Sequence, residues 1–436
     1  FDTPVIVKMC TRISHSQSVV DTSEREERET IPYVKDPAKY VMVPANAKIR
    51  HPFVEERTKK LAEWGNTSGI NRVEKAADPE CKRGFITGST SYQYIKEVFG
   101  DSVSVLKLGM PYPFPDELIK EFAKDLDDIT VAEEMDPIVE EHCKALGINV
   151  HGKDLLPMVG EYSQNLIAKV LAGQEVDEES KCDIETPVRP PIMCPGCPHR
   201  GIFYTLKRNK CIVIGDIGCY TLAAAEPLAS MDMTLCMGAS VSATHGFLKA
   251  LGEDAPKNVV GVIGDSTFIH SGMTGLAEIA YNQSNATIVI LDNSTTGMTG
   301  QQENPTTGYN IKGDPAGKID LEALVKAMGI RRVRVVDPLD LKACNAVVKE
   351  ELAADEPSVI ITRRPCVLLK SVKKLPALRV NPDKCTGCGA CMKIGCPALA
   401  MKDGKVVVDE TLCVGSGCNL CTQMCGFGAF EYPGEE

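Results

Sequence analysis

VVGVIGDSTFIHSGMTGLAEIAYNQSNATIVILDNSTTG, residues 259–297, is the segment whose pattern most directly predicts an architecture. An apolar run ends in Gly264-Asp265-Ser266, a helical segment follows, and a second apolar run ends at Asp292-Asn293. This order is typical of a strand–helix–strand unit in a parallel sheet. In open sheets of this kind, ligands bind beyond the carboxyl ends of the strands, which is where these polar residues fall.

The polar residues at these strand ends predict a magnesium site. Asp265 and Asn293 carry the hard oxygen ligands that Mg²⁺ prefers, and Mg²⁺ usually shares its coordination with a substrate phosphate. A helix N-terminus near Ser271 would favour an anion at the same edge. An ordinary crossover with Gly264-Asp265 as a turn explains the first motif alone equally well. The oxygen-bearing pair at the end of the next strand favours the metal site.

The alternation of strands and helices extends well beyond this unit. Apolar runs typical of strands, CIVIGD, NVVGVIGD, ATIVILDN, VRVVD and SVIITRR, predict an α/β domain at 192–372. A second alternation, which includes the strand RGFITG and the helix SYQYIKEVFG, predicts another α/β domain at 79–176. Residues 177–191, rich in Pro and charge, are typical of a linker, and 46–78 of a charged helical connector. Residues 1–45 include TPVIVKMCTRIS, which has strand character but no preceding partner.

Composition argues against several classes of function. The 436 residues carry a net charge of −11, which disfavours nucleic acid, because affinity for it comes from Lys and Arg that neutralise phosphates. No apolar run of about 18 residues predicts a membrane span, and no signal-peptide pattern is present. The chain starts at Phe1 rather than Met, so we expect a fragment or an incomplete chain. Nineteen cysteines without a secretion signal favour metal ligation over disulfides.

The cysteines near the C-terminus follow the spacing of ferredoxins with two clusters. The first run is C-x2-C-x2-C-x4-C-P at 385–397, and the second is C-x4-C-x2-C-x3-C at 413–425. In such domains the fourth cysteine of each run ligates the other cluster. We therefore expect one 4Fe–4S cluster at Cys385, Cys388, Cys391 and Cys425, and another at Cys396, Cys413, Cys418 and Cys421.

This tail, expected to form a domain at 373–436, departs from the usual ferredoxin pattern in two ways. The first run has four residues before its last cysteine where three are usual, and Gly426 follows Cys425 where proline often stands. The longer loop removes no ligand. A zinc ribbon also uses C-x2-C pairs, but eight thiolates in this cadence, with Pro397 after the fourth, favour iron–sulfur clusters.

The segment from Gly264-Asp265-Ser266 to Asn293 resembles the diphosphate-binding motif of thiamine diphosphate enzymes. MCPGCPHRGIFYTLKR, VIGDIGCYTLAAAEPLASMDMTLCMGAS and TRRPC are similar to the alpha subunits of indolepyruvate:ferredoxin oxidoreductases, within the 2-oxoacid:ferredoxin oxidoreductase family. FDTPVIVKMCTRISHSQSVV and VLKLGMPYPFPDELI extend the resemblance over essentially the whole chain. A thiamine motif and a ferredoxin tail on one polypeptide form a specific combination.

The resemblance implies an enzyme that uses thiamine diphosphate and Mg²⁺. In the family, the Asp, the Asn and a main-chain carbonyl two residues later hold Mg²⁺ on the diphosphate, which here are Asp265, Asn293 and Thr295. Arylpyruvates would lose CO₂, coenzyme A would take the acyl group, and 4Fe–4S clusters would pass electrons singly to a soluble ferredoxin. A smaller beta subunit is the implied partner in a hetero-oligomer. Oxygen-sensitive clusters suggest an anaerobic cytoplasm.

By the same resemblance, 1–45 is a remnant of a pyrimidine-binding domain and 79–176 resembles the C-terminal domain of transketolase. The Glu that activates thiamine is expected in a part preceding Phe1, so the isolated chain should be inactive or nearly so. Two other functions remain open: a ferredoxin oxidoreductase for pyruvate or another 2-oxoacid, and an electron-transfer subunit with a vestigial thiamine fold. The presence of both Asp265 and Asn293 argues against a vestigial fold.

Four further cysteines are candidate ligands of a third cluster: Cys194, Cys197, Cys219 and Cys366. In related 2-oxoacid oxidoreductases a C-x2-C pair, a later Cys and a distal Cys hold a cluster beside thiamine. Reduced structural thiols explain the same residues equally well, because C-x-x-C alone is a weak signal. The other cysteines lack ligand-like spacing and are interpreted as structural: Cys10, Cys81, Cys143, Cys182, Cys211, Cys236 and Cys344.

A few residues near these motifs have two interpretations each. His199 and His270 could reach the diphosphate or donate a proton, although a structural role is the simpler one. His15 could line a pocket with a missing partner domain. Gly238 could let the backbone approach the cofactor, or let a helix pack closely on the sheet. The acidic runs EREERE and EEMD are expected to be solvated.

Overall fold

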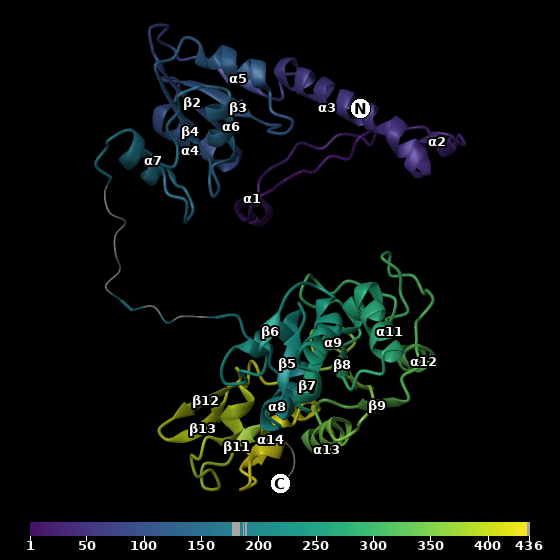
Figure 1. Cartoon of the computed structure of the whole chain (residues 1–436). Coiled ribbons are helices and arrows are strands. Elements are labelled where there is room, and N and C mark those ends of the chain that lie inside the picture. The colour runs from purple at the N-terminus through teal and green to yellow at the C-terminus, as the bar shows by residue number, and fades with distance from the viewer. Residues whose placement is uncertain (177–183, 186, 188–189, 434–436) are drawn as a thin grey trace. The chain divides into compact units, whose positions relative to one another are not determined.

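The chain forms two compact units, Phe1–Glu185 and Thr186–Glu436 (Figure 1). The computed structural model describes residues 1–176, 184–185, 187 and 190–433. The predicted linker 177–191 therefore lies largely outside the described residues, and so does Cys182. Within the described part of the chain, no helix combines the length and the apolar character needed to cross a bilayer.

The first unit begins with mostly exposed chain and three helices, α1 Thr11–His15, α2 Pro37–Tyr40 and α3 Pro44–Thr67. α3 covers much of the predicted helical connector, and a proline is tolerated in its first turn because that N–H has no helical partner. The strand expected from TPVIVKMCTRIS is not formed, since residues 1–10 lack regular structure and 11–15 are helical. A strand needs a hydrogen-bonded neighbour, and no described strand pairs with this segment.

A four-stranded sheet with the order β1-β3-β2-β4 organises the rest of the first unit. β2 pairs in parallel with β3 and β4, whereas the edge strand β1 is antiparallel to β3. Successive side chains such as Phe85 and Ile86 enter different apolar clusters, because a strand alternates its faces. The elements are β1 Arg72–Glu74, β2 Arg83–Gly88, α4 Ser89–Phe99, β3 Ser104–Leu108, α5 Asp116–Ala123, β4 Asp128–Ala132, α6 Ile138–Ala145 and α7 Gln164–Leu171.

The acidic run EREERE is exposed, as predicted, but EEMD at 133–136 is more than a solvated face. Glu133 is half-buried, and its carboxylate accepts hydrogen bonds from the N–H groups of Val139 (3.0 Å) and Glu140 (2.9 Å) near the start of α6. Glu134 accepts one from the N–H of Tyr162 (2.8 Å). Burial raises the pKa of Glu133. The prediction was wrong because these carboxylates satisfy otherwise unpaired backbone donors, which charge patterning cannot show.

The second unit contains a six-stranded parallel sheet with the order β6-β5-β7-β8-β10-β9. The strands predicted from the apolar runs are all present, and a short strand, β6, is added at one edge. The central strands β7 and β8 are buried almost throughout, which explains their continuous apolar sequence. The strands are β5 Ile212–Gly215, β6 Met233–Thr234, β7 Val259–Gly264, β8 Thr287–Asp292, β9 Arg332–Val336 and β10 Ser358–Arg363.

Helices cover this sheet from both sides (Figure 1). One apolar cluster joins Val262 of β7 to α8 His199–Arg208 and α13 Leu341–Leu352. The neighbouring Ile263 enters the other cluster, with α9 Ala239–Leu251, α11 Met273–Tyr281 and α12 Leu321–Ala327. The expected α/β architecture with a parallel sheet is therefore confirmed. Short helical turns occur at Cys219–Ala224, Gly252–Asp254, Asp265–Thr267 (α10) and Phe268–Gly272.

The cysteine-rich tail forms two small antiparallel strand pairs within the second unit. β11 Arg379–Val380 pairs with β14 Phe430–Glu431, and β12 Leu399–Lys402 pairs with β13 Lys405–Val408. The cysteines themselves make up much of the tail's apolar cluster, and Tyr204 and Leu339 of the sheet domain join it. The tail is thus packed on the sheet domain. Its remaining elements are helical turns at Ala390–Ile394 and Gly415–Gly417, and α14 Leu420–Met424.

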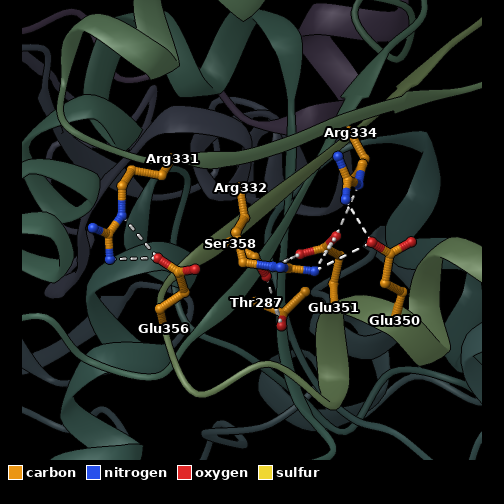
Figure 2. Close-up of polar contacts among 8 residues, drawn as sticks. All are labelled: Thr287, Arg331, Arg332, Arg334, Glu350, Glu351, Glu356 and Ser358. Atoms are coloured by element: carbon orange, nitrogen blue, oxygen red, sulfur yellow. Dashed lines mark hydrogen bonds and ion pairs between the residues drawn. The ribbon is translucent and has the colours of Figure 1, made fainter.

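Ion pairs tie α13 to the edge strand β9 (Figure 2). Glu351 is buried near the end of α13, and its carboxylate accepts hydrogen bonds from Arg332 Nε (2.8 Å) and Nη2 (3.1 Å). Arg334 Nε lies 3.1 Å from the same carboxylate. Arg331 pairs with Glu356 at a more exposed position. A buried carboxylate is stable only while such partners remain.

We expect Glu351→Gln to lower the free energy of unfolding by about 1–3 kcal/mol, because a neutral amide cannot balance the two guanidinium groups. Urea unfolding of the purified protein measures this change. Glu356→Gln is the matched control at an exposed pair and should cost less than about 1 kcal/mol. Equal losses in the two variants would show that burial does not make the Glu351 pair special.

Candidate functional site

The predicted magnesium site lies where β7 and β8 end side by side. The two strands pair in parallel with Gly264 opposite Leu291, so Asp265 and Asn293 follow them at the same edge of the sheet. Asp265, Asn293 and Thr295 are all buried. The structure therefore brings the predicted oxygen ligands into one buried region at the carboxyl edge of the sheet.

The Asp265 carboxylate has one oxygen satisfied and one without a partner. Oδ1 accepts a hydrogen bond from the N–H of Ser266 (2.7 Å), whereas the buried Oδ2 has no hydrogen-bond partner among the residues that the structure describes. Burial is the main influence on this carboxyl and raises its pKa to about 7, against the smaller lowering effect of nearby N–H groups. A divalent cation would satisfy the orphaned oxygen and keep the carboxylate charged, so these residues fit Mg²⁺.

Asp216 supports the same edge of the sheet, and sequence reasoning did not assign it a role. It follows β5, is fully buried, and both of its oxygens accept from the N–H of Gly238 (2.9 Å each). Oδ2 also accepts from the N–H of Ser240 (3.2 Å), so the carboxylate holds the start of α9. The available signal was the Gly-Asp pair at the end of β5, which repeats the Gly-Asp pair at the end of β7.

Gly238 is required by close packing. Its φ is +90°, and a Cβ built on it would lie 1.9 Å from Ser271 Oγ. Any side chain would therefore collide with the helical turn that follows β7. The close contact of Gly238 is therefore with this turn rather than with the sheet, and the approach of a cofactor to its backbone stays a prediction.

The three candidate histidines lie in different environments. His199 is buried at the start of α8, with Nε2 3.4 Å from Asn293 Nδ2. Burial lowers the pKa of His199 to about 4, so the ring is neutral at pH 7 and can orient the amide rather than donate a proton from an imidazolium. His270 is exposed and pairs with Ser271 Oγ (2.9 Å). His15 is exposed in α1 of the first unit.

Of the four cysteines proposed for a third cluster, Cys366 and Cys219 lie close to Asn293. The N–H of Cys366 donates to the Asn293 carbonyl (2.9 Å). A Cβ on Gly297 would lie 3.5 Å from Cys219 Sγ and 3.6 Å from Asn293 Nδ2. Burial raises the pKa of Cys219, and the thiols of Cys366 and Cys194 raise it further. Burial likewise raises the pKa of Cys197 to about 12, with Cys194 and Cys219 contributing.

The eight tail cysteines line two separate cavities, four in each. Cys385, Cys388, Cys391 and Cys425 line one, with Phe427 and Phe430 in its apolar wall. Cys396, Cys413, Cys418 and Cys421 line the other. The structure thus groups the cysteines across the two runs in the sets expected from the spacing. No three His, Cys, Asp or Glu side chains of the described residues converge tightly enough to hold a single metal ion.

The upstream cysteines adjoin one of these cavities. Pro195 and Gly196, which lie between Cys194 and Cys197, help to line the cavity of Cys396. Gly196 has a φ of +71°, and a Cβ built on it would lie 2.4 Å from Val414 Cγ2. The cysteine sets therefore follow an order, from the thiols beside Asn293 to the Cys396 set, which contacts the C-x2-C loop, and then to the Cys385 set, where Cys388 is exposed.

The cysteines without ligand-like spacing differ in burial. Cys143 and Cys344 are buried, and burial raises the pKa of each to about 12, as expected for inert structural thiols. Burial also raises the pKa of the half-buried Cys211 to about 12. Cys236, by contrast, is exposed, so the expectation of burial is wrong for this residue. Cys10 and Cys81 are intermediate.

Two protein families match this chain, one over the Asp265–Asn293 region and one over the cysteine-rich tail. Residues 216–362 match the family described as thiamine pyrophosphate enzyme, C-terminal TPP binding domain. Residues 378–400 match the 4Fe-4S binding domain. The first match contains Asp265 and Asn293, and the second contains the first cysteine run of the tail. The chain therefore carries a thiamine diphosphate-binding domain and an iron–sulfur domain.

Oxidoreductase subunits from two archaea align with nearly the whole chain. Indolepyruvate oxidoreductase subunit IorA of Pyrococcus horikoshii is 38% identical over 98% of this chain and 73% of its own length. The subunit of the same name from Methanothermobacter thermautotrophicus is 34% identical over 99% of this chain and 73% of its own. A solved 2-oxoglutarate:ferredoxin oxidoreductase from Magnetococcus marinus, 20% identical, aligns with a TM-score of 0.36 over 45% of this chain and 74% of that chain.

Proposed function

Because the chain belongs to the family of indolepyruvate oxidoreductase subunits IorA, we propose that it catalyses the oxidative decarboxylation of arylpyruvates, including indolepyruvate. Coenzyme A would accept the acyl group, and ferredoxin would accept the electrons by way of 4Fe–4S clusters. The observation that supports this best is the presence, in one compact unit, of the buried Asp265–Asn293 edge and two cavities lined by four cysteines each. A 2-oxoacid:ferredoxin oxidoreductase needs both.

The residues at the carboxyl edge of the sheet would hold Mg²⁺ and the diphosphate. Asp265 would supply the charged oxygen, Asn293 its amide oxygen, and Thr295 its main-chain carbonyl. The neutral His199 lies beside Asn293 Nδ2, where it would keep the amide oxygen turned toward the metal. When bound, thiamine diphosphate supplies the electron sink for loss of CO₂. Because these side chains are buried, they would limit the access of bulk water to a metal bound there.

The cysteine sets suggest three iron–sulfur positions between the thiamine site and the surface. Cys194, Cys197, Cys219 and Cys366 would hold the one beside the thiamine site. The tail cavities would hold the other two, with the Cys396 set in the middle and the Cys385 set outermost. The exposure of Cys388 supports the outer set as the place where ferredoxin collects electrons. A beta subunit in a hetero-oligomer is the proposed partner of the whole assembly.

The choice of 2-oxoacid is tested by comparing substrates on the complex with its partner subunit. We expect indolepyruvate and phenylpyruvate to give a kcat/KM for ferredoxin reduction at least about tenfold above that of pyruvate or 2-oxoglutarate, with turnover dependent on coenzyme A. A preference for pyruvate or 2-oxoglutarate would indicate the alternative substrate class. If no 2-oxoacid is turned over and no Mg²⁺-dependent binding of thiamine diphosphate is found, the chain is an electron-transfer subunit.

A further inference from the structure

Arg200 is a buried cation for which no described carboxylate acts as a partner. It is the second residue of α8 and only 3% exposed. The positive end of the helix dipole makes this position unfavourable for a cation. A buried charge is costly unless something of opposite charge balances it. Among the described residues, no carboxylate supplies the negative charge that would balance Arg200.

Among the described residues, the hydrogen-bond partners of Arg200 are all carbonyl oxygens. Nη1 donates to the carbonyls of Ile394 (3.1 Å) and Gly395 (2.5 Å). Nη2 donates to the carbonyls of Met193 (2.6 Å) and Cys194 (3.1 Å). Nε is buried and has no hydrogen-bond partner within the described part of the chain. These carbonyls fix the orientation of the guanidinium but carry no net charge, and one donor is left over.

The guanidinium lies between two sets of cysteines. One carbonyl it binds belongs to Cys194, the first cysteine of the upstream set, and another belongs to Gly395, which precedes Cys396. Arg200 also lines the cavity formed by the Cys396 set. The residues that line the other tail cavity include no Lys or Arg. Lys405 donates to the Cys385 carbonyl (2.7 Å) but is exposed, so water screens its charge.

We propose that Arg200 is a positioning residue that balances the charge of the iron–sulfur cluster held by Cys396, Cys413, Cys418 and Cys421, and so raises that cluster's reduction potential. The proposal rests on the proposed function, because it requires a cluster in that cavity. A cluster ligated by four thiolates is an anion, and one added electron makes it more negative. A buried cation therefore stabilises the reduced form more than the oxidised form. The step adds one electron to the cluster and transfers no proton.

The test is a redox titration of the anaerobically purified complex, followed by the electron paramagnetic resonance of the reduced clusters. Three variants at one position separate charge from shape: Arg200→Gln, Arg200→Met and Arg200→Lys. Arg208→Gln removes the same charge from an exposed position on the same helix and is the matched control. Iron and acid-labile sulfide are measured on every sample. Cys194→Ser/Cys197→Ser provides a second background, in which the tail clusters can be titrated without the upstream one.

At the wild-type midpoint, we expect the two neutral variants to lower the reduced-to-oxidised ratio of one tail cluster about tenfold, equivalent to 59 mV for one electron. Arg200→Lys should keep most of the wild-type value, and Arg208→Gln should change nothing. An unchanged midpoint in neutral variants with full iron would overturn the proposal. If the neutral variants lose iron and Arg200→Lys keeps it, the charge is needed to hold the cluster, which supports the proposal. Iron loss in all three would assign Arg200 a purely structural role.

The iron content separates this proposal from the proposed function. Fewer than about eight irons in the wild-type protein would remove the tail clusters themselves, and with them the proposed function. A full iron content with no Arg200 effect leaves the proposed function standing and overturns only the role of Arg200.

Discussion

Asp265→Asn should weaken the Mg²⁺-dependent binding of thiamine diphosphate by on the order of 100-fold, or about 2.8 kcal/mol. The variant keeps the size of the side chain but loses the charge of a buried carboxylate whose Oδ2 has no partner in the described residues. The other side chain predicted to bind the metal, Asn293, is a neutral amide and cannot replace that charge. Calorimetric titration of the complex with thiamine diphosphate at several Mg²⁺ concentrations measures the effect.

Asp292→Asn is the matched control for this substitution. Asp292 ends the neighbouring strand, but its carboxylate pairs with Arg363 Nε (2.8 Å) instead of being left without a partner. We expect the control to keep its affinity within about threefold, because the neighbouring pair does not supply a metal ligand. If both variants lost thiamine diphosphate equally, Asp265 would have no specific role as a metal ligand.

Asp265→Asn should weaken cofactor binding but stabilise the metal-free protein at neutral and alkaline pH. Burial raises the pKa of Asp265 to about 7, from about 3.9 in an unfolded chain. The wild-type protein therefore loses stability as the pH rises between these values, because a buried carboxyl must ionise. Without Mg²⁺, Asp265→Asn should match the wild type below about pH 4 and exceed it in melting temperature above about pH 7. A variant less stable at pH 8 would show that the native carboxylate has a partner after all.

Cys194→Ser/Cys197→Ser should lower the iron content of anaerobically purified protein from about twelve to about eight atoms per chain, with a matching loss of sulfide. The two thiols belong to the set proposed for a third cluster, and a serine oxygen is a poor ligand for iron in such clusters. Activity should fall with the iron, since the position nearest the thiamine site would be empty. The unfolding transition of the variant should stay cooperative, because the tail clusters remain.

Cys344→Ala controls for the loss of a buried thiol. Cys344 lies in the same unit but far from any ligand-like spacing, with its thiol directed to the Asp337 carbonyl. The iron content of Cys344→Ala should equal that of the wild-type protein. About eight irons in the wild type and in the double variant would reduce the upstream cysteines to structural thiols. Zinc in place of iron, with fewer than about eight irons, would contradict the tail assignment as well.

Local pattern was sufficient for much of the fold. The strands of the second unit were predictable because a buried parallel strand must be continuously apolar, as β7 and β8 are. The proximity of Asp265 and Asn293 was predictable because the carboxyl ends of neighbouring parallel strands lie at the same edge of a sheet. The grouping of the tail cysteines followed from their spacing, since the ligand sets of a two-cluster domain are interleaved.

The burial of polar residues and the identity of their hydrogen-bond partners could not be predicted from local sequence patterns. Glu133 looks like any surface acid until the N–H groups of α6 are placed beside it. The segment at 3–14 has the composition of a strand but finds no described strand to pair with. The role of Asp216 could be recognised only from the fold, which places the N–H of Gly238, just before α9, against its carboxylate.

The amino-acid sequence alone specifies the alternation of strands and helices, the types of ligand at the strand ends and the spacing of the tail cysteines. All of these depend on residues close together in the chain. Three further features required the three-dimensional arrangement. Asp265 Oδ2 has no partner among the described residues, His199 is buried against Asn293, and Arg200 joins the carbonyls of Cys194 and Gly395. These features depend on desolvation and on contacts between distant segments, and neither is encoded in local spacing.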